Sequence, residues 1–313
     1  MNSQIEAWRV QQYASNVYRL AQQKGSRLAN LLRQESFTGK AEFFDRIGSA
    51  TAQEKAGRNV DTPNLNIDHS RRMLVSKTYD WGTLVDRTDK LENIHSPESH
   101  YAVAAKDGLG RKMDDVIIEA LLGTARYGED GSSSQTLGNA QKVTATTGAA
   151  LDYPNMLFLR KLKRKFDEAE VEGARILVHG ADFLDALLGV TQVTSSDYAA
   201  VKALVRGEID TFMGFKFVHS ERLPLASVHD DADYHFNVAT GYYDAAGTDM
   251  VGTEKCCLAF VGDGGIFGKR TGAEVAKIEE RADKSYSNQI YIAQDFGALR
   301  MEEYKVVQGI YKA

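Results

Sequence analysis

The sequence predicts an α+β fold with more than one domain. Three features support this prediction: residues 96–127 have the spacing of one long buried helix, residues 37–85 alternate with the period of strands, and residues 151–270 alternate between short helices and strands. A helix of about thirty residues is roughly 45 Å long, so it needs a partner surface along much of its length. The strand-like segments can provide that surface.

The composition is typical of a globular chain that buries a sizeable core. The 313 residues are 43% hydrophobic and 26% charged, and no run of eighteen apolar residues predicts a transmembrane helix. The N-terminus also lacks the basic and apolar regions of a signal peptide. A net charge of −5 argues against a dedicated nucleic-acid binder. Cys256 and Cys257 are adjacent, which indicates a reducing compartment and no disulfide framework.

Residues 1–36 predict a helical arm. Its apolar residues include Ile5, Trp8, Tyr13 and Val17, but glutamine and serine are frequent and Gly25 interrupts the pattern. Such an arm has too little apolar surface to form its own domain. We expect it to pack on another surface, such as a neighbouring chain.

Residues 37–82 predict an extended β-hairpin. Two strand-like arms, around 37–48 and 65–85, flank a polar loop that contains Gly57 and Pro63. A two-stranded ribbon is at best marginally stable alone in water. The hairpin therefore needs a surface to lie on, which is a first indication of assembly.

The helix at 96–127 is expected to begin and end at specific residues. Ser96 can cap its start, Pro97 suits the first helical position, and Gly128 is placed to end it. Gly108 and Gly110 each cost roughly 1 kcal/mol relative to alanine, as does Gly123, so we expect the helix to bend.

Residues 151–270 predict a compact mixed α/β domain, and long strands return over 271–313. A helix is expected to open near Pro154, and further short elements follow, including a helix over 195–207.

Two sequence patterns could indicate chemistry. The glycine-rich stretch Gly262–Gly268 follows a strand as a phosphate-binding loop does, but Arg270 follows Lys269 where serine or threonine should hold magnesium. His229, Asp230, Asp231, Asp233 and His235 could ligate a metal, although charged surface loops look the same. No nucleophile motif occurs. We expect no cofactor, no metal and no enzymatic activity.

Two groups of charges leave several readings open. Arg160, Lys161, Lys163, Arg164 and Lys165 precede four acidic residues, an order opposite to the one that the helix dipole favours. The helix face that carries these charges is a solvated surface, an inter-subunit salt-bridge surface or a surface that binds nucleic acid. Arg71 and Arg72, beside the hairpin, allow the same three readings.

The order of these parts resembles the major capsid protein of tailed bacteriophages, the Hong Kong 97-type capsid fold. Four segments are similar to segments of that family: WGTLVDRTDKLENI, RKMDDVIIEALLG, GEIDTFMGFKFVHSERLP and DFGALRMEEYKVVQGIYK. The resemblance spans nearly the whole chain. It implies an N-terminal arm at 1–36, an extended E-loop at 37–82, a P domain at 83–150 with the spine helix 96–127, an A domain at 151–270, and closing strands of the P domain at 271–313.

The resemblance implies a structural role. Copies of the chain would form hexamers and pentamers that assemble into an icosahedral shell around the double-stranded DNA of a tailed phage. They would assemble in the host bacterial cytoplasm with a separate scaffolding protein, a portal and possible decoration proteins, without a membrane. The short segment before the E-loop suggests the separate scaffold. The expected inter-subunit contacts are Phe43, Arg46, Arg71, Arg72, Arg160, Lys163, Arg164 and Glu168.

Two other functions remain open at this point. An encapsulin-type nanocompartment shell would have the same fold and would enclose a protein cargo. A nucleotide-binding enzyme, from a different class, would use the Gly262–Gly268 loop. A minor tail or decoration protein is a third option, and it fits the layout less well.

Overall fold

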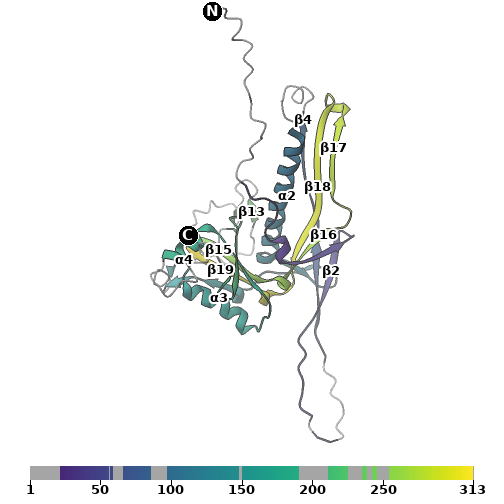
Figure 1. Ribbon diagram of the computed structural model, residues 1–313. Helices are drawn as coiled ribbons and strands as arrows, with labels where there is room; N and C mark the ends of the chain where they lie inside the picture. Colours follow the sequence, from purple (N-terminus) through teal and green to yellow (C-terminus); the bar gives the residue numbers. More distant parts are fainter. Residues whose placement is uncertain are drawn as a thin grey trace, which may run out of the picture.

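The computed structural model describes residues 22–55, 57–58, 66–85, 97–147, 150–189, 211–224, 235–237, 242–244 and 254–312. Two large sheets, one long helix and a projecting hairpin make up this part of the chain (Figure 1). Most of the expected arm, the whole of the expected helix at 195–207, and the metal-ligand candidates His229, Asp230, Asp231 and Asp233 lie outside the described residues.

The elongated sheet contains five strands. Its order is β1 (Arg33–Phe37), β16 (Gly265–Arg270), β18 (Ser287–Arg300) and β17 (Val275–Arg281), and β4 (Lys77–Val85) pairs with the other edge of β18. β17 and β18 form a long antiparallel hairpin around η5 (Ala282–Lys284). The sheet therefore extends well beyond the rest of the body, alongside the long helix (Figure 1).

The long helix is α2 (Pro97–Leu122), which begins close to where the sequence predicts and ends five residues earlier. Gly123 closes it, since its N–H donates to the carbonyl of Glu119 at 2.8 Å. A β carbon on Gly123 would lie 2.6 Å from that oxygen. The predicted end at Gly128 is wrong, because the chain after Gly123 forms β5 (Ala125–Tyr127) and pairs with β3 (His69–Val75).

The six-stranded sheet has the order β11, β12, β10, β15, β19 and β7. Its strands span Thr211–Phe212, Phe215–His219, Arg175–His179, Glu254–Val261, Val306–Lys312 and Lys142–Thr144 in that order. In β15, Cys257 and Ala259 face α3 (Met156–Glu168) and α4 (Ala181–Gly189), whereas Leu258 and Phe260 belong to the core that contains the end of α2. Both faces of this sheet are therefore buried.

After β15 the chain crosses between the two sheets twice, and this alters the expected boundary at residue 270. It leaves β15 through η4 (Gly262–Gly264) into β16, and it returns from β18 through η6 (Glu303–Lys305) into β19. The crossings touch, because the N–H of Met301 donates to the carbonyl of Gly264 at 2.9 Å. Hence β16 joins the elongated sheet and β19 the six-stranded sheet, where the sequence analysis expected the reverse.

The projecting hairpin pairs β2 (Ala41–Ile47) with β3 in antiparallel register, from Ala41 opposite Val75 to Ile47 opposite His69. The prediction of a hairpin is therefore confirmed for these strands. Its expected extent of 37–82 was too long, because β1 and β4 are taken up by the elongated sheet. The hairpin projects from the body in the direction opposite to the tip of β17 and β18 (Figure 1).

Short elements complete the described chain. β5 pairs with β6 (Ser133–Gln135), β8 (Thr146–Thr147) pairs with β9 (Ala150–Leu151), and β13 (His235–Asn237) pairs with β14 (Tyr242–Asp244). Single turns occur at η2 (Ala29–Leu31) and η3 (Asn139–Gln141). Among the helices in the described ranges, none is long and apolar enough to cross a membrane.

Candidate inter-subunit surfaces

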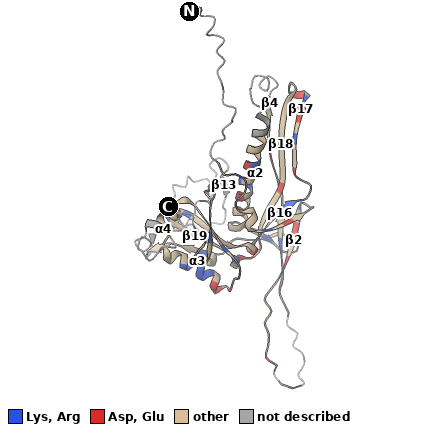
Figure 2. Cartoon of the chain, in the orientation of Figure 1, with Lys and Arg blue, Asp and Glu red and all other residues tan. Residues whose placement is uncertain are grey.

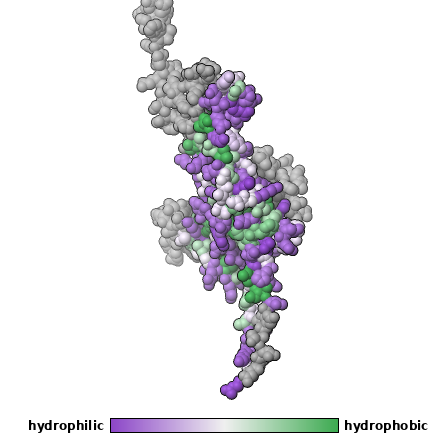
Figure 3. Space-filling view, turned by 90° about the vertical axis from the view of Figure 1, so that its right-hand side faces the viewer, coloured by the Kyte–Doolittle hydropathy of each residue, from purple (hydrophilic) through white to green (hydrophobic). Residues whose placement is uncertain are grey.

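The hairpin exposes apolar side chains without a core of its own. Phe43 and Ile67 are each 39% exposed, and Ile47 is 71% exposed. Arg71 lies over the Phe43 ring, 5.6 Å from its centroid, and pairs with Asp45 at 2.6 Å. This hydrogen bond holds the pKa of the Asp45 carboxyl below its usual value. Figure 3 shows a largely hydrophilic face with a hydrophobic patch where the hairpin leaves the body.

The base of the hairpin is fixed to the body through one carboxylate. Glu303 pairs with Arg72 of β3, with Arg46 of β2 at 3.6 Å and with Arg300 of β18 at 3.7 Å. We call these four residues the Glu303 cluster. Arg46 also donates to the carbonyl of Met301 at 2.5 Å. The cluster therefore sets the direction in which the hairpin leaves the body.

Burial is the main electrostatic cost of the Glu303 cluster. Arg72 and Arg300 are fully buried. Desolvation lowers the pKa of the Arg300 guanidinium to about 10 and also lowers that of Arg72, and the nearby Glu303 carboxylate opposes both shifts. Arg300 is further held by the carbonyls of Leu121 at 2.8 Å and Gly123 at 2.5 Å, at the end of α2.

This burial bears on the expected contact residues. The Arg72 side chain is fully buried within its own subunit, and Arg46 is largely used by Met301 and Glu303. Phe43 and Arg71 remain exposed enough for contact. The sequence could not distinguish Arg71 from its neighbour Arg72, because alternation separates two faces of a strand without saying which one is covered.

Asp114 of α2 holds the segment that precedes η2. Its buried carboxylate accepts hydrogen bonds from the Ser26 hydroxyl at 2.5 Å, the Arg27 N–H at 3.0 Å, the Leu28 N–H at 3.0 Å and the Gln23 side chain at 2.5 Å. A carboxylate that accepts several N–H and O–H donors forms strong, charge-assisted bonds. This segment is therefore attached firmly to α2, an arrangement that the sequence analysis did not predict.

Two glycines allow that attachment. A β carbon on Gly110 would overlap the backbone of Gly25 and lie 2.8 Å from the nitrogen of Ser26, so the segment crosses α2 in direct backbone contact. Gly25 has a φ of +64°, and Asp107 accepts its N–H at 3.2 Å. The available signal was the spacing of Asp107, Arg111 and Asp114, which places three charges on one face of a helix that is otherwise largely apolar.

Helix α3 presents the second expected contact surface. Its buried residues pack on the six-stranded sheet, whereas Arg160 and Arg164 are exposed and Lys163 is half-buried. Arg164 pairs with Glu168 at 2.5 Å within the helix. These four expected contact residues therefore lie on the solvent side of one element. Figure 2 shows Lys and Arg concentrated along α3.

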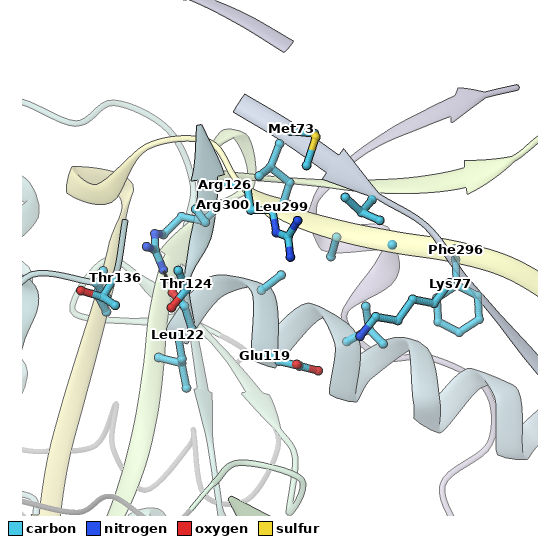
Figure 4. A pocket seen from close by; sticks show the side chains of 18 of the residues that line it. Met73, Lys77, Glu119, Leu122, Thr124, Arg126, Thr136, Phe296, Leu299 and Arg300 are labelled. Atoms are coloured by element: carbon cyan, nitrogen blue, oxygen red, sulfur yellow. Dashed lines mark hydrogen bonds between the residues drawn. The ribbon is translucent and has the colours of Figure 1, made fainter. Parts of the chain in front are cut away.

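A pocket of about 620 Å³ lies between the base of the hairpin, the end of α2 and β18 (Figure 4). Lys77, Arg126 and Lys142 make its lining basic, and Glu119 on α2 contributes a carboxylate to it. Among the described residues that line it, there is no histidine, cysteine or serine, and Glu119 is the one carboxylate.

The glycines of the Gly262–Gly268 stretch serve close packing. A β carbon on Gly265 would lie 2.7 Å from Leu121, and one on Gly268 would lie 2.7 Å from Phe37 and 3.0 Å from Leu74. A phosphate-binding loop needs free N–H groups around an open space. In this chain Gly265 pairs with Arg300 and Gly268 pairs with Gly297 of β18, so both glycines belong to the elongated sheet and not to an open loop.

A scan against protein-family models gives a match over nearly the entire chain. The phage capsid protein model matches residues 5–312. The chain belongs to this family. No curated protein sequence matches that of this capsid protein.

Solved capsids have the same fold as this capsid protein. The capsid structure of the cyanophage P-SCSP1u has a TM-score of 0.68 and 14% identity, covering 99% of this chain and 94% of that chain. The capsid of Ralstonia phage GP4 has a TM-score of 0.68 and 10% identity, with 97% and 96% covered. The structure from Mycobacterium phage Che8 has a TM-score of 0.64 and 16% identity, with 96% of each chain covered.

These matches decide between the readings that the sequence left open. The fold is the α+β Hong Kong 97-type capsid fold, as the resemblance implied. The protein is a major capsid protein that forms the phage shell, a structural component of the virion that associates with copies of itself. Neither the encapsulin nor the nucleotide-binding enzyme is favoured by these findings.

Proposed function

We propose that this capsid protein assembles through hexamers and pentamers into an icosahedral shell around the double-stranded DNA of a tailed phage, and that it has no enzymatic activity. The observation that supports this assembly is the hairpin. Its base is held by the Glu303 cluster, in which Arg72 and Arg300 are fully buried, yet Phe43 and Ile47 lie exposed on strands that project from the body (Figure 1). A rigidly anchored ribbon with exposed apolar side chains needs a second surface.

That second surface is the body of an adjacent subunit. Each subunit then gives one hairpin and receives another, which is a heterologous contact that closes into rings. Many modest contacts repeated around a closed shell give high overall stability. Within this proposal, Phe43 and Arg71 contact the neighbour through the hairpin, and Arg160, Lys163, Arg164 and Glu168 contact it through α3.

The domain division follows the two sheets in this proposal. The A domain consists of the six-stranded sheet with α3 and α4, and the P domain consists of α2 with the elongated sheet. The E-loop is the hairpin of β2 and β3, and the arm is the chain before it. Assembly takes place in the host bacterial cytoplasm with a separate scaffolding protein, a portal and decoration proteins.

Deletion of residues 48–63 tests the role of the hairpin. The deletion leaves β2, β3 and the Glu303 cluster, so the subunit should fold and remain soluble, as circular dichroism and thermal unfolding can verify. We expect no complete shells by electron microscopy. Substitution of the exposed Ile278 of β17 by aspartate serves as a control, because it alters an apolar residue elsewhere and should leave assembly intact. Normal shells from the deletion variant would falsify the proposal.

A further inference from the structure

Helix α3 has a fixed orientation that directs a row of cations outward. The Asn155 side chain accepts the N–H of Phe158 at 2.9 Å at the start of the helix. Phe158, Leu159, Leu162 and Phe166 are fully buried against the six-stranded sheet. Because the helix cannot rotate about its axis without exposing these side chains, the residues between them in sequence must face away from the sheet.

Most of this positive charge has no partner within the described part of the subunit. Arg164 pairs with Glu168, and Asp167 pairs with Arg175 at 2.7 Å. The remaining cations of the helix form no ion pair with any other residue that the structure describes: Arg160, Lys161, Lys163 and Lys165. Like charges at three- and four-residue spacing on a helix repel one another, so an acidic partner would stabilise these cations.

The apolar residues of this surface indicate a protein partner. Leu157 lies on the same face as Arg160 and Arg164 and is 51% exposed. Tyr153, just before the helix, is 48% exposed and lies 5.5 Å from the Lys312 ammonium. A phosphate backbone would use only the cations, whereas a peptide with acidic and apolar side chains uses the whole surface.

The chain itself contains a segment of the complementary composition. Between Leu225 and Thr253 there is no lysine or arginine. The acidic and aromatic residues of this segment are Asp230, Asp231, Asp233, Tyr234, Phe236, Tyr242, Tyr243, Asp244 and Asp249. It includes the residues that the sequence analysis considered as metal ligands, and its composition suits a basic surface with exposed Leu157 and Tyr153.

We propose that the basic face of α3 binds the aspartate-rich segment 225–253 of an adjacent copy of this chain. This inference rests on the proposed function, since it requires subunits arranged in a ring. In such a ring, each subunit presents its α3 to one neighbour and its segment 225–253 to the other. Two different patches that meet head to tail generate a closed ring when the rotation between successive copies closes.

Charge reversal tests this pairing. The variant Arg160→Glu/Lys161→Glu should fold as the wild type does and yield about tenfold fewer shells, because like charges placed opposite each other disfavour association. Asp230→Lys/Asp231→Lys should have the same effect. The chain with all four substitutions should regain assembly. The variant Lys277→Glu/Lys284→Glu, on the β17–β18 hairpin, is the matched control and should assemble normally.

Covalent capture tests the contact without relying on the charge variants. In assembled shells of the variant Lys161→Cys/Asp231→Cys, a bismaleimide should produce a ladder of covalent oligomers, and neither single variant should. The native thiols of Cys256 and Cys257 are buried and should not react.

The charge-reversal and crosslinking experiments distinguish this inference from the alternatives. Normal shells from both reversed pairs, or no ladder, would overturn this inference and leave the proposed function intact. Normal shell yield with less enclosed DNA in Arg160→Glu/Lys161→Glu would overturn it in favour of a nucleic-acid surface. Failure of the wild type to form shells under all conditions would overturn both proposals.

Discussion

Gly297 of β18 lies directly beneath the carbonyl of Val75, the last residue of β3, with no room for a side chain between them. A β carbon on Gly297 would overlap the Val75 oxygen and lie 3.3 Å from the α carbon of Ser76. Gly297 pairs with Gly268 of β16, and Leu74 fills the space above that second glycine. The paired glycines thus form a depression in the elongated sheet through which the chain leaves the hairpin.

We expect Gly297→Ala to lower the thermal stability of the subunit. The added methyl group meets a backbone carbonyl, which cannot move aside as a flexible side chain can, and overpacking of this kind costs about 1–3 kcal/mol. Gly138→Ala is the matched control, because no atom lies within 4 Å of the new methyl group and the residue has a φ of −63°. Calorimetry on both variants checks the prediction, and equal melting temperatures would contradict it.

Two helical glycines of α2 should respond in opposite directions. Gly108→Ala meets only the end of the Arg111 side chain at 3.6 Å, so it should stabilise the helix by up to about 1 kcal/mol. Gly110→Ala meets the backbone of Gly25 and should displace the segment held by Asp114. Urea unfolding measures the first effect. Hydrogen exchange at Arg27 and Leu28 measures the second, and unchanged exchange there would exclude the proposed crossing.

The variant Glu303→Gln should destabilise the subunit strongly. It leaves Arg72 and Arg300 as buried cations without their carboxylate, a change that costs about 3–5 kcal/mol. Glu302→Gln removes an exposed carboxylate paired with Lys305 at 3.0 Å, and it should cost less than about 1 kcal/mol. Equilibrium unfolding of both proteins measures the difference. Similar values would mean that the Glu303 cluster does not fix the hairpin.

The two cysteines should be unreactive in the folded subunit. Both are buried, and burial raises the pKa of the Cys256 thiol to about 12 and that of Cys257 well above its usual value. A thiol reagent at pH 8 should therefore detect both only after denaturant is added. Rapid modification without denaturant would show that the six-stranded sheet opens readily.

The same shift makes stability depend on pH. Below about pH 9 the Cys256 thiol is neutral in both the folded and the unfolded chain. The stabilisation of the folded chain by this group is therefore fully present there. Between about pH 9 and 12 the unfolded chain loses this proton first, and the free energy of unfolding falls by up to about 1.4 kcal/mol per pH unit for this group. Cys256→Ala should reduce that slope, which urea unfolding at pH 8 and pH 10 can measure.

Local patterns located most elements correctly, because periodicity and capping act over a few residues. The start of α2, the hairpin strands and the opening of α3 follow from such signals. What escaped prediction depends on residues far apart in the chain. The end of α2 at Gly123 depends on β5 pairing with β3, and the burial of Arg72 depends on Glu303, 231 residues away.

The candidate surfaces were predicted unevenly for the same reason. The exposed positions of α3 follow from helical spacing, so Arg160 and Arg164 lie where expected. The glycines of Gly262–Gly268 resemble a phosphate loop in sequence alone, since the side chains of Leu74 and Leu121 that explain them come from other elements.

Electron microscopy of the purified full-length chain, with its mass from size-exclusion chromatography, tests the central claim most directly. The account predicts closed shells tens of nanometres across, or rings of capsomer size. A homogeneous monomer or dimer at every salt and protein concentration, including after co-expression with the scaffolding protein, would contradict it.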